Sequence, residues 1–443
     1  MEKISVFGTG YLGATHAAGM AELGHEVIGV DIDAEKVERL SRGEVPFYEP
    51  GLPDLLRKHV DSGRLRFTTD PSVATDFADI HFVAVGTPQR KGEYAADMRF
   101  VDGVVETIAP RMTRPGVIFG KSTVPVGTAA RLASRVRELS PVGDAVELAW
   151  NPEFLREGFA VEDTLRPDRL VIGVDPARPG RAEAVARAVY APILERGTPF
   201  LVTDLATAEL VKVSANAFLA TKISFINAIA EVCDAAGADV VQLADAIGYD
   251  ERIGRKFLGA GLGFGGGCLP KDIRAFMARA GELGVDQALT FLREVDAVNM
   301  RRREHVVQLA ARELGGRVNG ARIAVLGAAF KPNSDDVRDS PALDVAGKLH
   351  LRGADVRVFD PQGMDNARKV SPTLRYATSV AAACEDADLV IVATEWAEFR
   401  QADPVALGER VAHRRVIDGR NCLPAEEWIS AGWSYRGLGR YSS

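Results

Sequence analysis

A short glycine-rich segment around one cysteine carries the residue types that covalent catalysis needs. The run Gly263–Asp272 reads GFGGGCLPKD, which places Cys268 directly after glycines and shortly before Lys271. Glycines have no Cβ, so a ligand can lie against their main chain. A nearby ammonium group favours the thiolate, which is the nucleophilic form of cysteine. The segment predicts a catalytic cysteine; the alternative is a glycine turn before a helix, with Cys268 as a small apolar filler.

The chain opens with the pattern of a dinucleotide-binding unit. A strand is predicted over 4–7, a G-x-G-x-x-G turn follows at Gly8–Gly13, and an alanine-rich helix leads to a strand over 26–30. The first glycine makes the tight turn, the second lets a pyrophosphate approach, and the third allows close helix packing. Asp31 ends the second strand, where a carboxylate binds ribose hydroxyls and repels a 2′-phosphate, so NAD is predicted rather than NADP. Lys36, in the next helix, is a further candidate for the ribose or a phosphate.

More strands are predicted further on, most of them separated by helical patterns. They cover 80–85, 117–121, 146–149 and 170–174. Together they predict a doubly wound parallel sheet, which binds ligands at the carboxyl ends of its strands. The loops at those ends are 86–88, 122–128 and 151–158.

The pattern changes to one long helix from about 204 to 236. Lys212 and Asn216 lie four residues apart in it, so they project from one face. Such a pair is commonly solvated, but here the neighbouring residues are mostly small or apolar. The two side chains are therefore predicted to point into a cleft. Further helices are predicted to about residue 316.

A second α/β pattern fills the C-terminal part. Its strands are predicted over 322–326, 355–359, 389–393 and 415–418, with a helix over 340–352. It lacks G-x-G-x-x-G, so a second dinucleotide bound in the same manner is not expected. Lys331, Arg338 and Arg420 fall in its loops and strand ends. Each alone is typical of a surface residue, but together they suit a phosphate-bearing ligand.

These patterns predict an α/β fold of two Rossmann-like doubly wound domains joined by a central helical domain that contains a long helix. The predicted domains are 1–203 for NAD, 204–316 for the helical and dimerisation part, and 317–443 for a phosphate-bearing ligand. The helical part has apolar residues on more than one face, which predicts at least a homodimer. They include Ile223, Phe225, Ile226 and Ile229.

The composition narrows the classes of partner. The 443 residues are 47% hydrophobic and 26% charged, with a formal net charge of −7. No basic stripe interleaved with aromatic residues occurs, so no nucleic-acid partner is expected. No charge-free stretch of about 18 apolar residues occurs, so no membrane span is expected. The start Met1-Glu2-Lys3 leads directly into a strand, so no signal peptide is expected.

The cysteines and histidines give no framework for cross-links or metal. Cys233, Cys268, Cys384 and Cys422 lie far apart without a C-x-x-C pair, and the seven histidines are scattered. Neither disulfides nor a metal site is predicted. A reducing cytoplasm is the expected location.

Taken together, the motifs resemble the UDP-glucose/GDP-mannose dehydrogenase family over about residues 3–430. The resemblance is carried by the opening glycine turn, STVPVGT, NPEFLREG, the K-x-x-x-N helix, GFGGxCxPKD and AFKPxxDDxR. Segments 252–258 and 167–173 are similar to the UDP-glucose members rather than the GDP-mannose ones. Gly267 departs from the pattern, which has a serine there, and this leaves loop stiffness and a hydroxyl contact in doubt.

The resemblance implies a four-electron oxidation at one carbon. UDP-glucose, two NAD and water would give UDP-glucuronate and two NADH. The first hydride transfer would yield an aldehyde, to which the cysteine adds; the resulting thiohemiacetal would lose a second hydride and become a thioester. Water would then hydrolyse the thioester.

The resemblance also assigns residues. The implied nucleophile is Cys268. Lys212 and Asp272 are implied to flank the reacting oxygen and thiol, with Lys212 stabilising oxyanion character. Asn216 is implied to position the substrate oxygen or a water, Glu153 to act as the base for the hydrolytic water, and Thr123 to hold that water. The implied cofactor-binding residues are Gly8, Gly10, Tyr11, Leu12, Gly13, Asp31, Lys36, Thr87, Thr123, Glu157, Lys271 and Arg338. The implied substrate-binding residues are Glu153, Phe154, Leu155, Glu157, Lys212, Asn216, Arg252 from a neighbouring subunit, Phe257, Gly265, Phe330, Lys331 and Arg420.

Three other functions stay open on the sequence. A two-electron β-hydroxyacid dehydrogenase shares the dinucleotide unit and the K-x-x-x-N pair, but needs neither the cysteine nor the second α/β part. The same oxidation on GDP-mannose or a UDP-N-acetylhexosamine differs only in a few pocket contacts. A non-catalytic NAD-binding protein would not need Cys268, Lys212 and Glu153 together.

Overall fold

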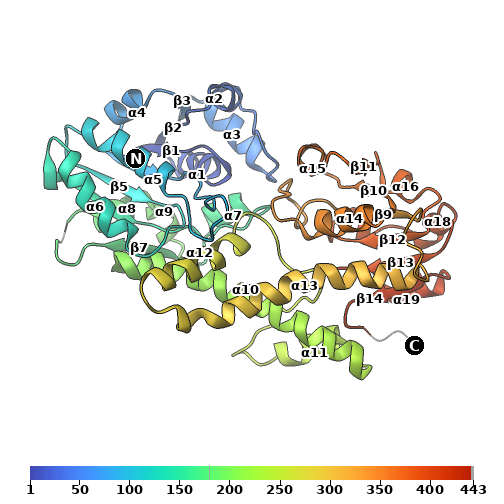
Figure 1. Ribbon diagram of the computed structural model, residues 1–443. Helices are drawn as coiled ribbons and strands as arrows, with labels where there is room; N and C mark the ends of the chain where they lie inside the picture. Colours follow the sequence, from blue (N-terminus) through green and yellow to red (C-terminus); the bar gives the residue numbers. More distant parts are fainter. Residues whose placement is uncertain (179, 441–443) are drawn as a thin grey trace. The chain divides into compact units, whose positions relative to one another are not determined.

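The computed structural model describes residues 1–178 and 180–440, which form two compact units (Figure 1). The first unit comprises Met1–Ala215 and Arg274–Gly284, and the second comprises Asn216–Ile273 and Val285–Ser443. Helices α10 (Leu205–Ala236) and α12 (Leu269–Glu282) each contribute residues to both units. Each unit is built around its own sheet.

The sheet of the first unit has eight strands in the order β3-β2-β1-β4-β5-β6-β7-β8. Their bounds are β1 Lys3–Phe7, β2 Glu26–Val30, β3 Leu65–Thr68, β4 Ile80–Val83, β5 Gly116–Gly120, β6 Val146–Trp150, β7 Leu170–Val174 and β8 Phe200–Asp204. The predicted α/β sheet is confirmed, with two corrections. The edge strands β3 and β8 were not predicted, and β7 pairs with β6 in the antiparallel direction. A run of apolar residues indicates a strand but carries no information on its direction.

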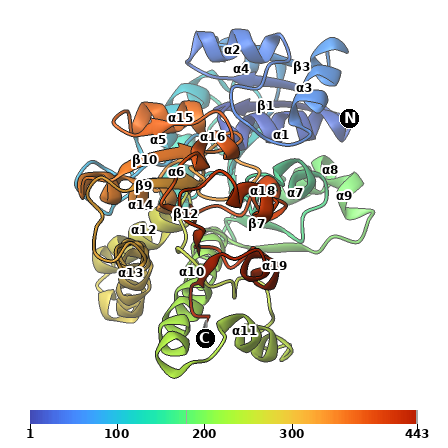
Figure 2. The same ribbon diagram turned by 90° about the vertical axis from the view of Figure 1, so that its right-hand side faces the viewer.

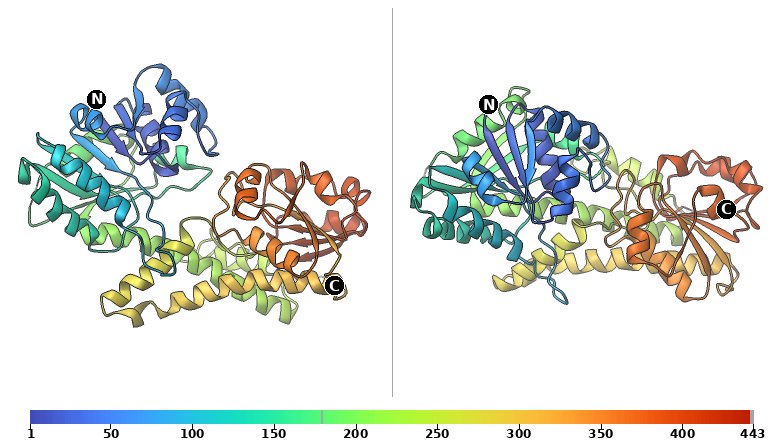
Figure 3. Two further views of the ribbon diagram at one scale, coloured as in Figure 1. Left: turned by 45° about the horizontal axis from the view of Figure 1, so that its top comes forward. Right: turned by 90° about the horizontal axis from the view of Figure 1, so that it is seen from above.

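Helices cover both faces of this sheet (Figure 3). Alternate residues of each strand point to opposite faces, so Val6 joins one apolar core and Phe7 the other. The first core includes residues of α1 Tyr11–Glu22, α3 Leu52–Asp61, α8 Ala182–Val189 and α9 Ala191–Leu194. The second includes residues of α4 Pro71–Phe77, α5 Arg99–Ile108 and α6 Thr128–Leu139. Two further helices are α2 Ala34–Ser41 and α7 Ala160–Leu165.

The sheet of the second unit is parallel throughout, in the order β11-β10-β9-β12-β13-β14 (Figure 1). Its strands β10, β9 and β12 lie side by side in Figure 2. Its strands are β9 Arg322–Leu326, β10 Asp355–Phe359, β11 Arg375–Tyr376, β12 Leu389–Val392, β13 Arg415–Asp418 and β14 Ser434–Gly437. The short β11 and the last strand β14, both at sheet edges, were not predicted. Helices α11 Val240–Gly248, α13 Thr290–Glu313, α14 Pro341–Leu351, α15 Met364–Val370, α16 Val380–Cys384, α17 Ala397–Arg400, α18 Pro404–Gly408 and α19 Ala425–Ser430 complete the unit.

Among the described residues, α10 is long and apolar enough to cross a membrane by length and composition alone, and 44% of that stretch is buried in the fold. Core helices of globular proteins share these properties. Inside the fold, its Ser224 donates a hydrogen bond to the Val295 carbonyl at 2.7 Å, and its Glu209 accepts one from the Gly127 amide at 2.7 Å. The expectation that nothing spans a membrane stays a prediction.

In each unit a buried aspartate directly follows the second strand in the chain, but the two carboxylates have different partners. In the second unit, Asp360 accepts hydrogen bonds from the amides of Ala328 and Ala329, at 2.7 and 2.9 Å. It also accepts them from the Gly363 amide at 2.7 Å and the Trp396 indole at 3.0 Å. This carboxylate is therefore used to build the turn after β9.

We predict that Asp360→Ala lowers the free energy of unfolding of the second unit by about 3 kcal/mol or more, because several buried donors lose a charged acceptor. Asp365→Ala, whose side chain is 89% exposed, is the matched control and should change it by less than about 0.5 kcal/mol. Denaturant unfolding followed by tryptophan fluorescence measures both. Equal stability of the two variants would contradict the structural role of Asp360.

Candidate active site

The glycine turn of the first unit has the geometry of a phosphate cradle. Gly8 adopts φ +89°, and its amide donates to the Val30 carbonyl at 2.8 Å. A Cβ at Gly13 would collide with the Gly8 carbonyl, whereas a Cβ at Gly10 would meet no described atom within 4 Å. The open space at Gly10 lies at the start of α1, where backbone N–H groups and the helix dipole favour an anion. The turn therefore fits the pyrophosphate of a dinucleotide.

Asp31 organises this turn. Its Oδ2 accepts hydrogen bonds from the Thr9 amide at 2.8 Å and the Thr9 hydroxyl at 2.9 Å, and it pairs with Lys36 Nζ at 3.0 Å. Burial alone would raise the pKa of Asp31, but the Thr9 and Asp33 amides and the Lys36 ammonium outweigh it and lower the pKa. The carboxylate is thus ionised at neutral pH, at the place where a ribose is expected.

Two loops at the carboxyl ends of β4 and β5 are joined by side-chain hydrogen bonds. The Thr87 hydroxyl donates to the Thr123 carbonyl at 2.8 Å, and the Ser122 hydroxyl donates to the Val85 carbonyl at 2.6 Å. Thr87 is buried and Thr123 is half-buried. Both therefore lie at the sheet edge where doubly wound folds bind ligands.

The loop after β6 carries an ion pair. Glu153 Oε1 lies 3.0 Å from Lys212 Nζ, and Glu153 Oε2 accepts a hydrogen bond from the Leu155 amide at 2.5 Å. The Phe154 ring lies under the Arg169 guanidinium, 3.9 Å away, and 5.7 Å from Lys212 Nζ. Lys212 is buried, so it does not lie on a solvated helix face.

A buried lysine that sequence reasoning missed supports the same loop. Lys121 follows β5, and its Nζ donates to Asn151 Oδ1 at 3.0 Å. The Tyr190 hydroxyl donates to the same oxygen at 2.6 Å. Burial lowers the pKa of Lys121 to about 8, with a further lowering by Lys212 that Glu153 opposes. The signal in the sequence was a lysine directly after an apolar strand.

The second unit holds the cysteine. Cys268 is exposed and directly precedes α12, so its thiol lies at a helix N-terminus, which favours a thiolate. One turn on, the buried Asp272 accepts a hydrogen bond from Asn216 Nδ2 at 2.6 Å and pairs with Lys271 Nζ at 2.6 Å. The structure therefore brings together the predicted residues Asn216, Lys271 and Asp272.

The glycine-rich segment before the cysteine is clamped by residues that the sequence did not indicate. Asn299 in α13 is fully buried; its Oδ1 accepts from the Phe264 amide at 2.8 Å, and its Nδ2 donates to the Phe264 carbonyl at 3.0 Å. Arg303, one turn on, donates to the same carbonyl at 3.4 Å and pairs with Asp339 at 2.8 Å. A Cβ at Gly263 would collide with Asn299 Oδ1. The clamp thus requires glycine there.

Glycine is also required at other positions of this segment. A Cβ at Gly265 would collide with the Asp339 carbonyl, and one at Gly266, which adopts φ +85°, would lie 2.7 Å from the Phe330 ring. A Cβ at Gly267 would meet the Arg338 guanidinium. Because Gly267 has no positive φ and the obstacle is the end of a flexible side chain, a serine there requires only that Arg338 moves.

The predicted ligand cations of the second unit have protein partners. Arg338 pairs with Asp336 at 2.7 Å. Arg420 donates to the carbonyls of Ala393 and Gly263, both at 2.9 Å, and to the Phe330 carbonyl at 3.3 Å. Arg420 therefore ties the turn after β9 to the glycine-rich segment. Lys331 Nζ lies 5.3 Å from the Phe330 ring centre.

Two further predicted residues, Arg252 and Phe257, lie in the segment after α11. Arg252 is exposed and pairs with Asp250 at 2.6 Å. Phe257 adopts φ +67° and is exposed. Neither contributes to the cluster around Asp272 in the described structure.

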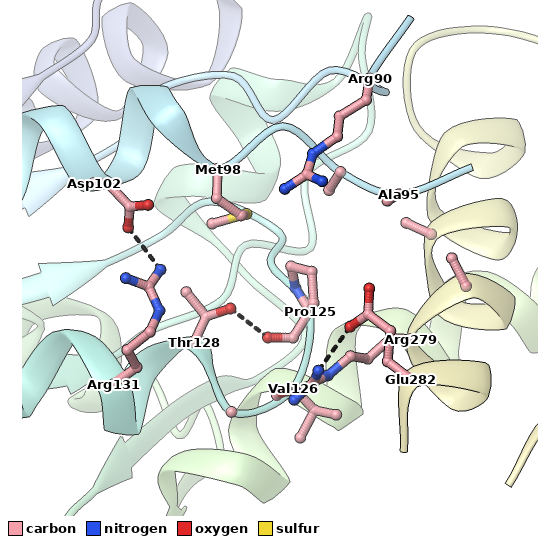
Figure 4. Close-up of a pocket in the computed structure, with 14 residues that line it drawn as sticks. Arg90, Ala95, Met98, Asp102, Pro125, Val126, Thr128, Arg131, Arg279 and Glu282 are labelled. Atoms are coloured by element: carbon pink, nitrogen blue, oxygen red, sulfur yellow. Dashed lines mark hydrogen bonds and ion pairs between the residues drawn. The ribbon is translucent and has the colours of Figure 1, made fainter. Parts of the chain in front are cut away.

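A separate polar cavity of about 360 Å³ opens in the first unit between α5, the start of α6 and the end of α12 (Figure 4). Carboxylates compensate the charges of the arginines that line it: Arg131 pairs with Asp102 at 2.6 Å, Arg279 with Glu282 at 2.7 Å and Arg90 with Glu93 at 3.8 Å. Within the described residues, none of the predicted site residues lines it. We therefore do not place the reaction there.

Comparison with known proteins gives matches along almost the whole chain. The UDP-glucose/GDP-mannose dehydrogenase family matches with its NAD binding domain at residues 2–194, its central domain at 206–301 and its UDP binding domain at 324–425. The chain is 43% identical to the UDP-glucose 6-dehydrogenase of Rhizobium meliloti over 99% of both chains. It is 42% identical to a UDP-glucose 6-dehydrogenase of Bacillus subtilis over 99% of this chain and 94% of that protein.

Solved structures give the same picture. A UDP-glucose dehydrogenase from Pyrobaculum islandicum superposes with a TM-score of 0.90 at 39% identity, covering 99% of this chain and 98% of that one. A UDP-D-ManNAc dehydrogenase from Pyrococcus horikoshii has a TM-score of 0.86 at 26% identity, covering 100% of both. The predicted fold class and family resemblance are confirmed.

We predict that the protein binds NAD at least about a hundredfold more tightly than NADP, because Asp31 is an ionised carboxylate at the ribose position and repels a 2′-phosphate. Asp31→Ser should narrow this difference to about tenfold or less. Asp54→Ser, an exposed change in α3, is the control. Calorimetric titration with both cofactors measures the difference, and equal affinities in the unaltered protein would contradict the assignment.

Proposed function

Because the chain belongs to the UDP-glucose/GDP-mannose dehydrogenase family, we propose that it oxidises UDP-glucose at C6 to UDP-glucuronate, with Cys268 holding the intermediate between two hydride transfers. The chain is an NAD-dependent oxidoreductase, and its C-terminal part is a UDP-binding domain that takes a nucleotide sugar. That the sugar of this nucleotide sugar is glucose is part of the proposal. The names of the relatives that are 43% and 42% identical support it.

One observation carries the cysteine chemistry. Cys268 is exposed at the N-terminus of α12, after a segment in which Cβ atoms would collide with the fold, and the Asp272 cluster lies one turn further on. A cysteine that only fills apolar space would not need to be exposed or to lie near the Asp272 cluster. The alternative of a simple glycine turn accounts for the glycines but not for the buried Asp272 with Asn216 and Lys271.

In the proposed first half-reaction, the C6 hydroxyl loses its proton and C6 loses a hydride, which leaves an aldehyde. Bound NAD supplies the hydride acceptor in both oxidation steps. The Cys268 thiolate then adds to the aldehyde carbon and forms a thiohemiacetal. Lys212 stabilises the negative charge on the C6 oxygen, and Asn216, held by Asp272, positions that oxygen by a hydrogen bond.

In the second half-reaction, the thiohemiacetal carbon loses a hydride and its oxygen loses a proton, which gives a thioester. Glu153 takes a proton from a water that Thr123 holds, and the water oxygen displaces the Cys268 thiolate. The ion pair with Lys212 holds the Glu153 carboxyl group in place for this role. Overall, one UDP-glucose, two NAD and one water yield one UDP-glucuronate and two NADH, and the protons lost from the C6 hydroxyl, the thiohemiacetal and the water pass to solvent.

The remaining assignments complete the proposal. The proposed cofactor contacts are the glycine turn with Tyr11 and Leu12, then Asp31, Lys36, Thr87, Thr123, Glu157, Lys271 and Arg338. The proposed sugar-nucleotide contacts are Phe154, Leu155, Glu157, Arg252, Phe257, Gly265, Phe330, Lys331 and Arg420. We propose the domains 1–203, 204–316 and 317–443, supported by three family matches that fall inside them. We also propose the cytoplasm as the compartment, without nucleic-acid or membrane partners; the net charge of −7 and the scattered cysteines support this.

Variants of the nucleophile and the base test the chemistry. Cys268→Ser should lower turnover by about a thousandfold or more, because an ester is a poorer acyl donor than a thioester, while both ligands still bind. Glu153→Gln should accumulate the thioester on the intact cysteine, because hydrolysis loses its base. Intact-protein mass spectrometry should detect an added UDP-glucuronyl group in each variant. Cys422→Ser is the matched control and should turn over normally; normal turnover of Cys268→Ser would overturn the proposal.

We further propose that the chain acts as a homodimer or a larger homo-oligomer. Phe218, Phe225 and Val232 recur every seven residues on α10 and are 65%, 51% and 60% exposed. Of the residues first expected to form the interface, Phe225 is exposed, but Ile226 is fully buried in the core of the second unit. A stripe of exposed apolar side chains on one helix supports a second copy as its cover.

We predict that Phe218→Glu combined with Phe225→Glu weakens self-association at least about tenfold, because an interface core does not tolerate unpaired buried charge. Leu351→Glu on α14, where the leucine is 86% exposed, is the control and should not change association. Sedimentation velocity at assay concentration measures the mass. A monomeric unaltered protein with full activity would contradict the proposal.

A further inference from the structure

Glu49 is a buried carboxylate that the proposed chemistry does not use. It lies in the connection between α2 and α3, and 1% of its surface is exposed. Its Oε2 accepts a hydrogen bond from the Gly158 amide at 2.6 Å, and its Oε1 accepts one from the Ala160 amide at 2.7 Å. Both amides belong to the end of the loop that carries Glu153 and to the start of α7. Glu49 therefore holds this loop by its backbone.

Tyr11 extends the contact to the dinucleotide-binding turn. It is the first residue of α1, directly after Gly10, and its hydroxyl donates to Glu49 Oε2. The same hydroxyl accepts a hydrogen bond from the Gly158 amide at 2.8 Å. Its ring packs against Phe47, with 5.0 Å between ring centres. One side chain of the phosphate cradle thus reaches both the carboxylate and the loop.

The hydrogen bonds to Glu49 explain why a carboxylate is needed there. Burial raises the pKa of Glu49, and the hydrogen bonds from Tyr11 and from backbone amides oppose that rise. The donors include the Tyr11 hydroxyl and the amides of Gly158 and Ala160. A carboxylate accepts at both oxygens, whereas a glutamine presents an NH₂ group to one of the backbone amides. Burial raises the pKa of Tyr11, and Glu49 raises it further, so the phenol keeps its proton as donor.

The other end of the loop is anchored separately. Asn151 is held by Lys121 and Tyr190, and the Glu153 side chain pairs with Lys212. Lys121 directly follows β5, Tyr190 lies between α8 and α9, and Lys212 belongs to α10. The link through Glu49 and Tyr11 instead leads to the start of α1, where the cofactor's pyrophosphate is expected. The loop is thus fixed at one end to the sheet and at the other end to the cofactor turn.

We propose that Glu49 is a positioning residue that couples the dinucleotide-binding turn to the loop 151–158 through Tyr11. Binding of the cofactor at the start of α1 then orders the backbone that carries Glu153 and Glu157. The catalytic part of this inference rests on the proposed function, whereas the coupling between cofactor and loop does not.

The test compares Glu49→Gln, Tyr11→Phe and the double variant. Glu49→Gln should lower kcat about ten- to a hundredfold while KM for NAD changes less than about threefold, because the loop shifts but the cradle remains. Tyr11→Phe should have a smaller effect on kcat. The double variant should be no slower than Glu49→Gln alone, since both changes break one network. Glu44→Gln, an exposed change in the same connection, is the control and should stay within about twofold.

Amide hydrogen exchange tests the coupling without the sugar. NADH should slow the exchange of the Gly158 and Ala160 amides at least about tenfold in the unaltered protein, and Tyr11→Phe should abolish this protection. No NADH effect on these amides in the unaltered protein overturns the proposal. So does a Glu49→Gln variant that melts at a lower temperature but keeps its kcat, because that role is only structural. If the unaltered protein makes no NADH from UDP-glucose, the proposed function fails and the exchange result alone decides the coupling.

Discussion

The two-way hydrogen bond between the Asn299 amide and the Phe264 backbone is the interaction on which the site of the second unit depends. A side-chain amide that accepts from the N–H of a residue and donates to the carbonyl of the same residue fixes the two peptide units on either side of it, and a fully buried amide has no water to compete for those bonds. Because Asn299 lies so close, residue 263 must be glycine. Arg303 and Arg420 add donors to the neighbouring carbonyls. The glycine-rich segment therefore fixes the position of Cys268, and α12 begins directly after that cysteine.

In the first unit, buried charged side chains fix the position of the loop 151–158. Lys121 under the loop 151–158, Lys212 beside Glu153, and Glu49 at the loop's end are all largely buried, and each meets a polar partner on the loop. Such groups are costly to bury unless they are paired, so they hold the backbone in one arrangement.

The two sheets also show how one position in the fold can serve two purposes. Asp31 and Asp360 both follow the second strand of their unit. Asp31 contacts a lysine and a threonine beside the open glycine turn, whereas Asp360 accepts hydrogen bonds from several groups of its own unit.

Much of this could be predicted from the sequence because its signals are local. The strand at 26–30, the long helix from about 204 and the strands at 322–326 and 355–359 follow from the spacing of apolar residues, and the glycine turn follows from a motif. The direction of β7, the edge strands β3, β8 and β14, and the burial of Ile226 depend on partners distant in sequence. So do Asn299, Lys121 and Glu49, which are polar residues without a motif. At Gly267 a motif was available, but it did not explain the departure from serine. Only the structure shows that the Arg338 guanidinium occupies the space of a side chain there.

We propose that one active cysteine, Cys268, links two oxidations of the same carbon. The direct measurement is the number of NADH molecules formed for each UDP-glucose consumed by the unaltered protein at completion, with the sugar product identified by mass. We predict two NADH per sugar, UDP-glucuronate as the product and no free aldehyde during turnover. One NADH per sugar, with an aldehyde or ketone as the final product, would contradict the account and point to a two-electron dehydrogenase.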